Sequence, residues 1–328
     1  MNGLETPSLL KLIERGDRRG LAKAISLVED DQASAASLLS GLRPPGKAFV
    51  IGVTGPPGTG KSTLVDRLIS QFRSRDLKVG VIAVDPSSPI TGGALLGDRI
   101  RMIDHVGDRG VFIRSMASRG WSGGLSRATS QTIQLMDSAG FDIVLVETVG
   151  IGQSDIEVSS VSHASLVVLM PGMGDDVQMS KAGLMEIGDV YVVNKGDLEG
   201  ADQIVVSLLS LVRTLKSRSP PVLKVSALTG EGLDKLVAAL EEIRSKFVVG
   251  GRELRLRSIR GMIVEMAKGN LVEDLMERSG RQVSELAESV LGGELSASDA
   301  AGILSRALTS GLRKRTSGLS DPRRSRRA

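Results

Sequence analysis

The stretch GPPGTGKS, Gly55–Ser62, decides the fold of this chain. The spacing G-x-x-x-x-G-K-S is typical of a loop whose backbone N–H groups surround a polyphosphate, because glycines keep side chains out of the way. An apolar run at 48–53 precedes the loop, and a helix-like run follows it from Ser62 onward. The order of strand, glycine-rich loop and helix predicts a binding site for a nucleoside triphosphate.

Two side chains at the end of this loop are expected to act on the phosphates. The ammonium group of Lys61 can reach the terminal phosphates, and the hydroxyl of Ser62 can bind Mg²⁺. The N-terminus of the following helix adds its partial positive charge. The predicted phosphate-binding residues are Gly55, Pro56, Pro57, Gly58, Thr59, Gly60, Lys61, Ser62 and Thr63.

The base is indicated further along the chain, where an N-K-x-D box at 194–197 follows an apolar run at 189–193. The carboxylate of Asp197 can accept hydrogen bonds from both N1–H and N2–H of guanine, a pair that adenine does not offer. Another apolar run, 221–225, leads to a backbone N–H that can meet the guanine O6. The predicted guanine-binding residues are Asn194, Lys195, Asp197, Ser226, Ala227 and Leu228.

Carboxylates at the ends of other apolar runs are expected near the metal ion. Asp85 ends the run at 78–84, Glu147 ends the run at 142–146, and Asp98 lies in the loop after Asp85. They would bind Mg²⁺ through water or polarise the attacking water, and which of them contacts the ion directly is left open. The backbone N–H of Gly150 can meet the γ-phosphate, but no glutamine follows it directly, so slow intrinsic hydrolysis is expected. The predicted metal ligands are Ser62, Asp85, Asp98 and Glu147, and the last three are, with Lys61, predicted catalytic residues.

Short apolar runs that alternate with helical stretches predict an α/β fold of the P-loop NTPase type, with a mainly parallel sheet flanked by helices. Helical patterns also lie before the sheet, at 4–40, and after it, at 253–312, where glycines predict three or four separate helices. The glycines concerned are Gly269, Gly280, Gly292, Gly293 and Gly302. We expect an N-terminal helical extension at 1–44, a GTPase domain at 45–249, a helical region at 250–315 and a basic, disordered tail at 316–328.

Composition restricts the class of protein. The chain has 328 residues, no cysteine and 2 histidines, so we expect neither disulfides nor a thiolate or imidazole metal cluster. We see no apolar run of membrane-spanning length and no secretory signal, which favours a cytoplasmic protein that does not bind membranes. The net charge of +4 is concentrated in the arginine-rich tail, so the body is near neutral or acidic, which argues against a nucleic-acid partner.

The motifs together resemble one family, the methylmalonyl-CoA mutase-associated GTPases. This is the MeaB/ArgK-like family, which belongs to the SIMIBI class of P-loop GTPases. The similarity covers about residues 5–310, and the block D-P-S-S-P-x-T-G-G…G-D-R is its most specific part. The similar segments are GPPGTGKST (55–63), AVDPSSPITGGALLGDRIRM (83–102), VETVGIGQSD (146–155), PGMGDDVQMSK (171–181) and VNKGD (193–197).

The resemblance implies a homodimer that binds GTP or GDP and assists an adenosylcobalamin-dependent acyl-CoA mutase, by gating cofactor loading and protection. It implies no bound cobalamin in the isolated protein, a dimerisation arm in the C-terminal helices, and a mobile switch at 171–181. Lys181 matches a lysine that the family uses in partner-stimulated hydrolysis. Two alternatives stay open: a GTPase of nickel-enzyme maturation, which needs Cys or His ligands, and an amino-acid transport-system kinase.

Overall fold

The computed structural model describes residues 6–30, 32–42, 47–85, 102–105, 107–117, 127–148, 150, 153–172, 183–214 and 219–316. The chain divides into two compact units, Met1–Met266 and Ala267–Ala328. Two predicted catalytic residues, Asp98 and Lys181, and the basic tail lie outside the described residues. Across the ranges just given, no helix has both the length and the apolar character needed to cross a membrane.

A seven-stranded sheet forms the centre of the first unit, and every strand pair in it is parallel. The strand order is β3-β2-β4-β1-β5-β6-β7. From the central strand β1 the chain therefore forms β2 and β3 at one edge, returns to β4 beside β1, and then adds β5, β6 and β7 on the other side. The sheet's central strands are mostly apolar and are buried along their whole length, as expected for parallel strands covered by helices on both faces. The predicted α/β fold is confirmed. The strands are β1 (Phe49–Thr54), β2 (Val79–Asp85), β3 (Val111–Ala117), β4 (Ile143–Glu147), β5 (Ala164–Leu169), β6 (Val190–Val193) and β7 (Val222–Lys224).

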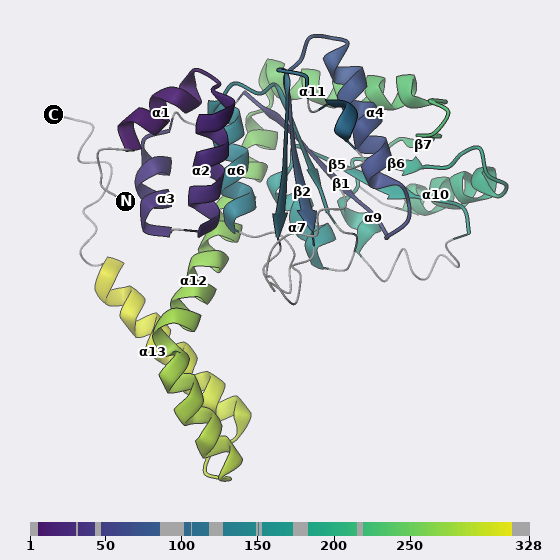
Figure 1. The fold of residues 1–328 in the computed structure, drawn as a ribbon. Helices are drawn as coiled ribbons and strands as arrows, with labels where there is room; N and C mark the ends of the chain where they lie inside the picture. The colour runs from purple at the N-terminus through teal and green to yellow at the C-terminus, as the bar shows by residue number, and fades with distance from the viewer. Residues whose placement is uncertain are drawn as a thin grey trace. The chain divides into compact units, whose positions relative to one another are not determined.

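Helices cover both faces of this sheet, and alternate residues of β1 belong to different cores. Phe49, Ile51 and Val53 pack in the core that contains the apolar residues of α4 (Lys61–Arg73) and α11 (Leu233–Gly250). Val50 packs in the other core, against α6 (Arg127–Ser138) and the N-terminal helices. Figure 1 shows α4 and α11 apart from the group formed by α1, α2, α3 and α6. The N-terminal helices are α1 (Thr6–Glu14), α2 (Arg18–Asp30) and α3 (Gln32–Ser40).

Shorter elements complete the first unit. The far strands β5 and β6 pack against α9 (Leu184–Ile187) and α10 (Ala201–Thr214) in a third apolar cluster. A 3-10 turn, η1 (Ile103–His105), precedes β3, and α7 (Gln153–Val161) lies between β4 and β5. Loops at the carboxyl ends of β1, β4 and β6 therefore meet at one edge of the sheet, where ligands of such folds bind.

The prediction of three or four C-terminal helices was wrong. The chain forms two long helices, α12 (Arg252–Leu291) and α13 (Ala297–Thr316), and Gly269, Gly280 and Gly302 lie inside them. A single glycine costs a helix only about 1 kcal/mol relative to alanine, which neighbouring residues offset. The break between the two helices is at Gly292–Gly293, where Gly293 has a left-handed backbone with a φ of 77°. Three residues later Ser296 caps α13, since its hydroxyl oxygen accepts the Asp299 N–H at 3.1 Å.

Candidate functional site: a phosphate loop and a base-recognition loop

The glycine-rich loop connects β1 to α4 in the tight turn that its sequence predicts. Gly60 caps α4 with a left-handed backbone, at φ 86° and ψ 28°. At Gly55 a β-carbon would lie 2.0 Å from the Val168 carbonyl oxygen, so only glycine fits between β1 and β5. The Thr59 hydroxyl donates to the Pro56 carbonyl at 2.9 Å and closes the turn. The loop is thus held in shape by its own residues.

Lys61 lies across the mouth of this loop. Its ammonium group donates to the carbonyl oxygens of Gly55 at 2.7 Å and Pro56 at 3.1 Å, and the residue is 6% exposed. Gly150, after β4, comes so close that a β-carbon on it would lie 2.8 Å from Lys61 Nζ and 2.0 Å from the Gly55 oxygen. A φ of 83° also favours glycine here. The structure thus brings Gly150 against the phosphate loop, and the contact of its N–H with the γ-phosphate stays a prediction.

Ser62 and Glu147 meet beside this lysine. The Ser62 hydroxyl donates to Glu147 Oε1 at 2.7 Å, and both residues are buried. The carboxylate accepts the hydrogen bond from the hydroxyl, which leaves the lone pairs on the serine oxygen for another ligand. Hydroxyl and carboxylate oxygens are the ligand types that Mg²⁺ prefers, so this pair fits that ion.

The other predicted acidic residues are placed only in part. Asp85 ends β2, which pairs with β4 so that Ala83 lies opposite Glu147; Asp85 is therefore two residues further along the same edge. The side chain of Asp85 is not among those described, and Asp98 and Lys181 lie wholly outside the described residues. Within the described part of the chain, no three His, Asp or Glu side chains gather as a metal cluster.

Asn194 joins the predicted base-recognition loops to the phosphate loop. Its amide nitrogen donates to the Thr59 carbonyl at 2.8 Å, and its amide oxygen accepts the Ala227 N–H at 3.0 Å. The side chain is 2% exposed, so these bonds are largely shielded from water. A β-carbon on Gly60 would lie 2.5 Å from its amide nitrogen, which shows how closely the two loops approach. One buried amide therefore fixes three loops relative to one another.

Asp197 lies exposed at the edge of the same site. A hydrogen bond from the Ser226 side chain, assisted by its own backbone N–H, lowers the pKa of Asp197 below its ordinary value. The carboxylate is thus kept ionised and ready to accept hydrogen bonds. Lys195 has a left-handed backbone, φ 55°, and the next N–H, of Gly196, donates to the Val225 carbonyl at 2.8 Å. The 194–197 and 226–228 segments, predicted separately, form one surface.

Sequence reasoning missed Arg67, which contacts the second base-recognition loop from α4. Its Nε donates to the Ala227 carbonyl at 2.9 Å, and another guanidinium nitrogen donates to the Leu228 carbonyl at 3.1 Å. Nothing in the sequence pattern indicates this contact, because 160 residues separate Arg67 from Ala227.

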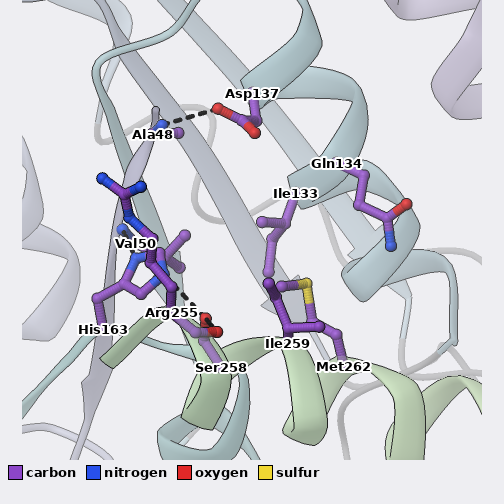
Figure 2. Close-up of a pocket in the computed structure, with 10 residues that line it drawn as sticks. All are labelled: Ala48, Val50, Ile133, Gln134, Asp137, His163, Arg255, Ser258, Ile259 and Met262. Carbon is purple, nitrogen blue, oxygen red and sulfur yellow. Dashed lines mark hydrogen bonds between the residues drawn. The ribbon is translucent and has the colours of Figure 1, made fainter. Parts of the chain in front are cut away.

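A separate small cavity lies near the start of β1, away from the loops at its carboxyl end (Figure 2). It measures about 20 Å³, room for about one water molecule, and apolar side chains form most of its wall. His163 lies beside it and accepts the Val50 N–H at Nδ1, 2.9 Å away, while its Nε2 is 2.9 Å from the Ser258 hydroxyl of α12. Burial, with repulsion from Arg257 and Arg255, lowers the pKa of His163 to about 3, which suits a packing role for the neutral ring.

Comparisons with known proteins agree with this geometry. A family model described as "Methylmalonyl Co-A mutase-associated GTPase MeaB" matches residues 21–281. A putative GTPase of Pyrococcus horikoshii is 43% identical over 307 residues, which cover 90% of this chain and 96% of the relative. The mitochondrial methylmalonic aciduria type A homolog of Mus musculus is 32% identical over 322 residues, 90% of this chain and 78% of the relative. A crystal structure of an LAO/AO transport system kinase has a TM-score of 0.68 at 27% identity, covering 94% of this chain and 99% of that one.

Proposed function

The chain belongs to the methylmalonyl-CoA mutase-associated GTPase family, so it is a P-loop GTPase of the SIMIBI class, and we propose that it uses GTP hydrolysis to assist an adenosylcobalamin-dependent acyl-CoA mutase. The extent of the family match carries this proposal. The matched residues, 21–281, include the sheet with its phosphate and base loops and most of α12 as well. The similarity therefore extends beyond the nucleotide site.

Phosphate binding rests on Lys61 and the backbone of the glycine-rich loop. In the described structure the Lys61 ammonium group donates hydrogen bonds to two loop carbonyls, at 2.7 and 3.1 Å. A bound polyphosphate would replace these carbonyls as the acceptor, because its charged oxygens form stronger hydrogen bonds with an ammonium group. The Ser62 hydroxyl, oriented by Glu147, would hold Mg²⁺. The ion, when bound, supplies positive charge to the phosphate oxygens.

Hydrolysis would be promoted mainly by charge stabilisation. Negative charge that develops on the transferred phosphoryl group would be met by Lys61 and by the backbone N–H of Gly150, which lies against the phosphate loop. We assign one of two roles to Asp85 and Asp98, as the sequence indicates: they polarise the attacking water, or they bind the metal ion through water. Because the site has no glutamine directly after Gly150, slow intrinsic turnover and acceleration by a partner are expected.

Guanine selection would use the surface formed by 194–197 and 226–228. Asp197 would accept N1–H and N2–H of guanine, while the backbone N–H of Leu228 would meet O6, because the Ala227 N–H is already bonded to Asn194. Asn194 holds these two loops together and ties both to the phosphate loop, as its bonds at 2.8 and 3.0 Å indicate. Adenine would leave the carboxylate without donors, which costs binding strongly in a site built for them.

Coupling to the partner would use the segments nearest the γ-phosphate. GTP and GDP differ by one phosphate, so only loops that touch it or its metal ion can report the difference. In this chain these are 86–101 and 149–155, with 171–181 further out, and we propose that the mutase orders the third and brings Lys181 into play. We further propose a homodimer formed through the helical region at 250–315, next to a GTPase domain at 45–249 and an N-terminal extension at 1–44.

The test is single-turnover hydrolysis of GTP with and without a purified acyl-CoA mutase. We expect the mutase to accelerate hydrolysis, and Lys181→Ala to remove most of the acceleration while slow intrinsic hydrolysis persists. Lys235→Ala, which changes an exposed lysine of α11, is the matched control and should keep full acceleration. Equal stimulation of the wild type and Lys181→Ala would disprove the role of Lys181, and no stimulation of any form would disprove the partner.

One alternative has a specific observation in its favour, the similarity to the crystal structure of an LAO/AO transport system kinase. A kinase and a GTPase differ in where the γ-phosphate goes. Incubation with γ-labelled GTP separates them, because a kinase transfers the label to protein and a GTPase releases it as inorganic phosphate. We expect free phosphate and no labelled protein.

A further inference from the structure

The two carbonyl groups that Arg67 contacts belong to the loop that would meet guanine O6. Its Nε and one terminal nitrogen lie 2.9 and 3.1 Å from the oxygens of Ala227 and Leu228, which are consecutive residues. A guanidinium group presents its donors in a planar fork, so it can hold two neighbouring carbonyls at once, which an ammonium group cannot do in the same way. The contact therefore fixes the orientation of the backbone at this point.

The Ala227 residue is held from both sides. Its N–H donates to Asn194 at 3.0 Å, and its carbonyl oxygen accepts from Arg67 at 2.9 Å. Leu228, the next residue, is 73% exposed and contributes little packing of its own side chain. Ala227 itself is buried in the apolar core, so the exposed residue Leu228 is the one whose position depends on polar contacts to the backbone.

Arg67 also links the base loop to the phosphate site through a single helix. It lies on α4, the helix that begins with Lys61 and Ser62 at the phosphate loop. A helix rises about 1.5 Å per residue, so the two regions of α4 are about 9 Å apart along its axis, a separation comparable to that between phosphates and base of one nucleotide. The same rigid element can therefore align both ends of the ligand.

We propose, on the basis of the guanine site put forward above, that Arg67 is a positioning residue for base recognition. It holds the carbonyls of Ala227 and Leu228 so that the backbone N–H of Leu228 points at guanine O6, since the Ala227 N–H is already bonded to Asn194 at 3.0 Å. Its effect on affinity then depends on the base atom that the loop meets. The ligand chemistry is a purine nucleotide with a 6-oxo group.

The test measures the affinities of four ligands for the full-length protein by calorimetry. GDP and inosine diphosphate keep O6, 6-thioguanosine diphosphate replaces it with a weaker acceptor, and pyrophosphate has no base. For Arg67→Ala we expect Kd to rise roughly tenfold for GDP and inosine diphosphate. We expect a change of at most about twofold for 6-thioguanosine diphosphate, whose sulfur makes only a weak contact with this loop, and for pyrophosphate, which makes none. Arg67→Lys should recover part of the loss.

Two controls separate this role from a general effect of charge or folding. Arg75→Ala removes an exposed arginine whose guanidinium contacts the Gln71 carbonyl, and it should leave all four affinities unchanged. Thermal melting should show that both arginine variants fold. An equal loss of affinity for GDP and 6-thioguanosine diphosphate, or no loss at all, would overturn the assignment of Arg67.

The Asp197→Asn variant keeps this outcome distinct from the fate of the guanine site itself. If it shifts preference from GDP to xanthosine diphosphate, the guanine site stands whatever Arg67 does. If it does not, the base-recognition surface itself is wrong, and the assignment of Arg67 is overturned with it.

Discussion

Replacing His163 with glutamine should make the stability of the protein less sensitive to acid. The ring of His163 is 5% exposed and accepts the Val50 N–H at Nδ1, so the neutral ring must carry its proton on Nε2, which faces the Ser258 hydroxyl. A second proton on Nδ1 would face the Val50 N–H and lose that bond. Arg255 and Arg257 add repulsion, and Arg257 is itself paired with Asp189 at 3.3 Å. Protonation of the folded protein at this ring is therefore strongly disfavoured.

The size of the effect follows from the two pKa values. The pKa of His163 is lowered to about 3 in the folded protein, from an ordinary value of 6.5. Between these values the unfolded chain binds a proton that the folded protein does not, so stability is full above pH 6.5 and falls as the pH drops towards 3. The expected loss between pH 7.5 and pH 5.5 is about 1.4 kcal/mol.

Urea unfolding of the full chain, followed by circular dichroism, measures this loss. His163→Gln retains an amide donor and acceptor but does not titrate, so its free energy of unfolding should fall by about 1.4 kcal/mol less than that of the wild type over this range. His105→Gln changes the other histidine of the chain and is the control. Its free energy of unfolding should still show the pH dependence that His163 causes. Parallel curves for the wild type and His163→Gln would refute the reasoning, because they would mean that the ring titrates alike in both states.

Three further changes probe the nucleotide site. Asp197→Asn should weaken GTP binding on the order of a hundredfold and favour xanthosine triphosphate, and unchanged affinity in calorimetry would remove Asp197 from the base site. Ser62→Ala should make GTP binding nearly independent of Mg²⁺; titrations with Mg²⁺ or EDTA check this, and a persistent difference between them would contradict the assigned ligand. Gly150→Ala should lower kcat/KM for GTP roughly a hundredfold, because its β-carbon would lie 2.8 Å from Lys61 Nζ, and a rate near that of the wild type would show that the loop moves freely.

The pattern of residues along the chain is enough to give the class of fold, and it also predicts the chemistry of the nucleotide site. Apolar runs of strand length separated by helical stretches suffice for a parallel sheet, because both faces of such strands must be buried. The glycine-rich loop is equally local: its glycines and Lys61 act within eight consecutive residues, so their spacing alone carries the prediction. The N-K-x-D box is likewise readable, since its side chains follow one another along a single loop.

The continuity of α12 shows where local rules gave the wrong result. Glycine is unfavourable in a helix, yet Gly269 and Gly280 remain inside α12 because the cost of each is about 1 kcal/mol, less than the neighbouring residues contribute. Gly292–Gly293 ends the helix because two glycines occur together and one takes a left-handed backbone. Breaks in helices depend on the sum over many residues, which single positions do not reveal.

Contacts between segments far apart in the sequence follow from how the elements pack against one another. Asn194 was predicted as a base contact, but its bonds to Thr59 and Ala227, 135 and 33 residues away, exist because three strand ends meet at one edge of the sheet. Arg67 carries no motif and acquires its contacts only when α4 packs beside the loop at 226–228. A spacing rule describes residues on one local element, whereas these hydrogen bonds depend on the relative placement of several elements, which burial of the common core fixes.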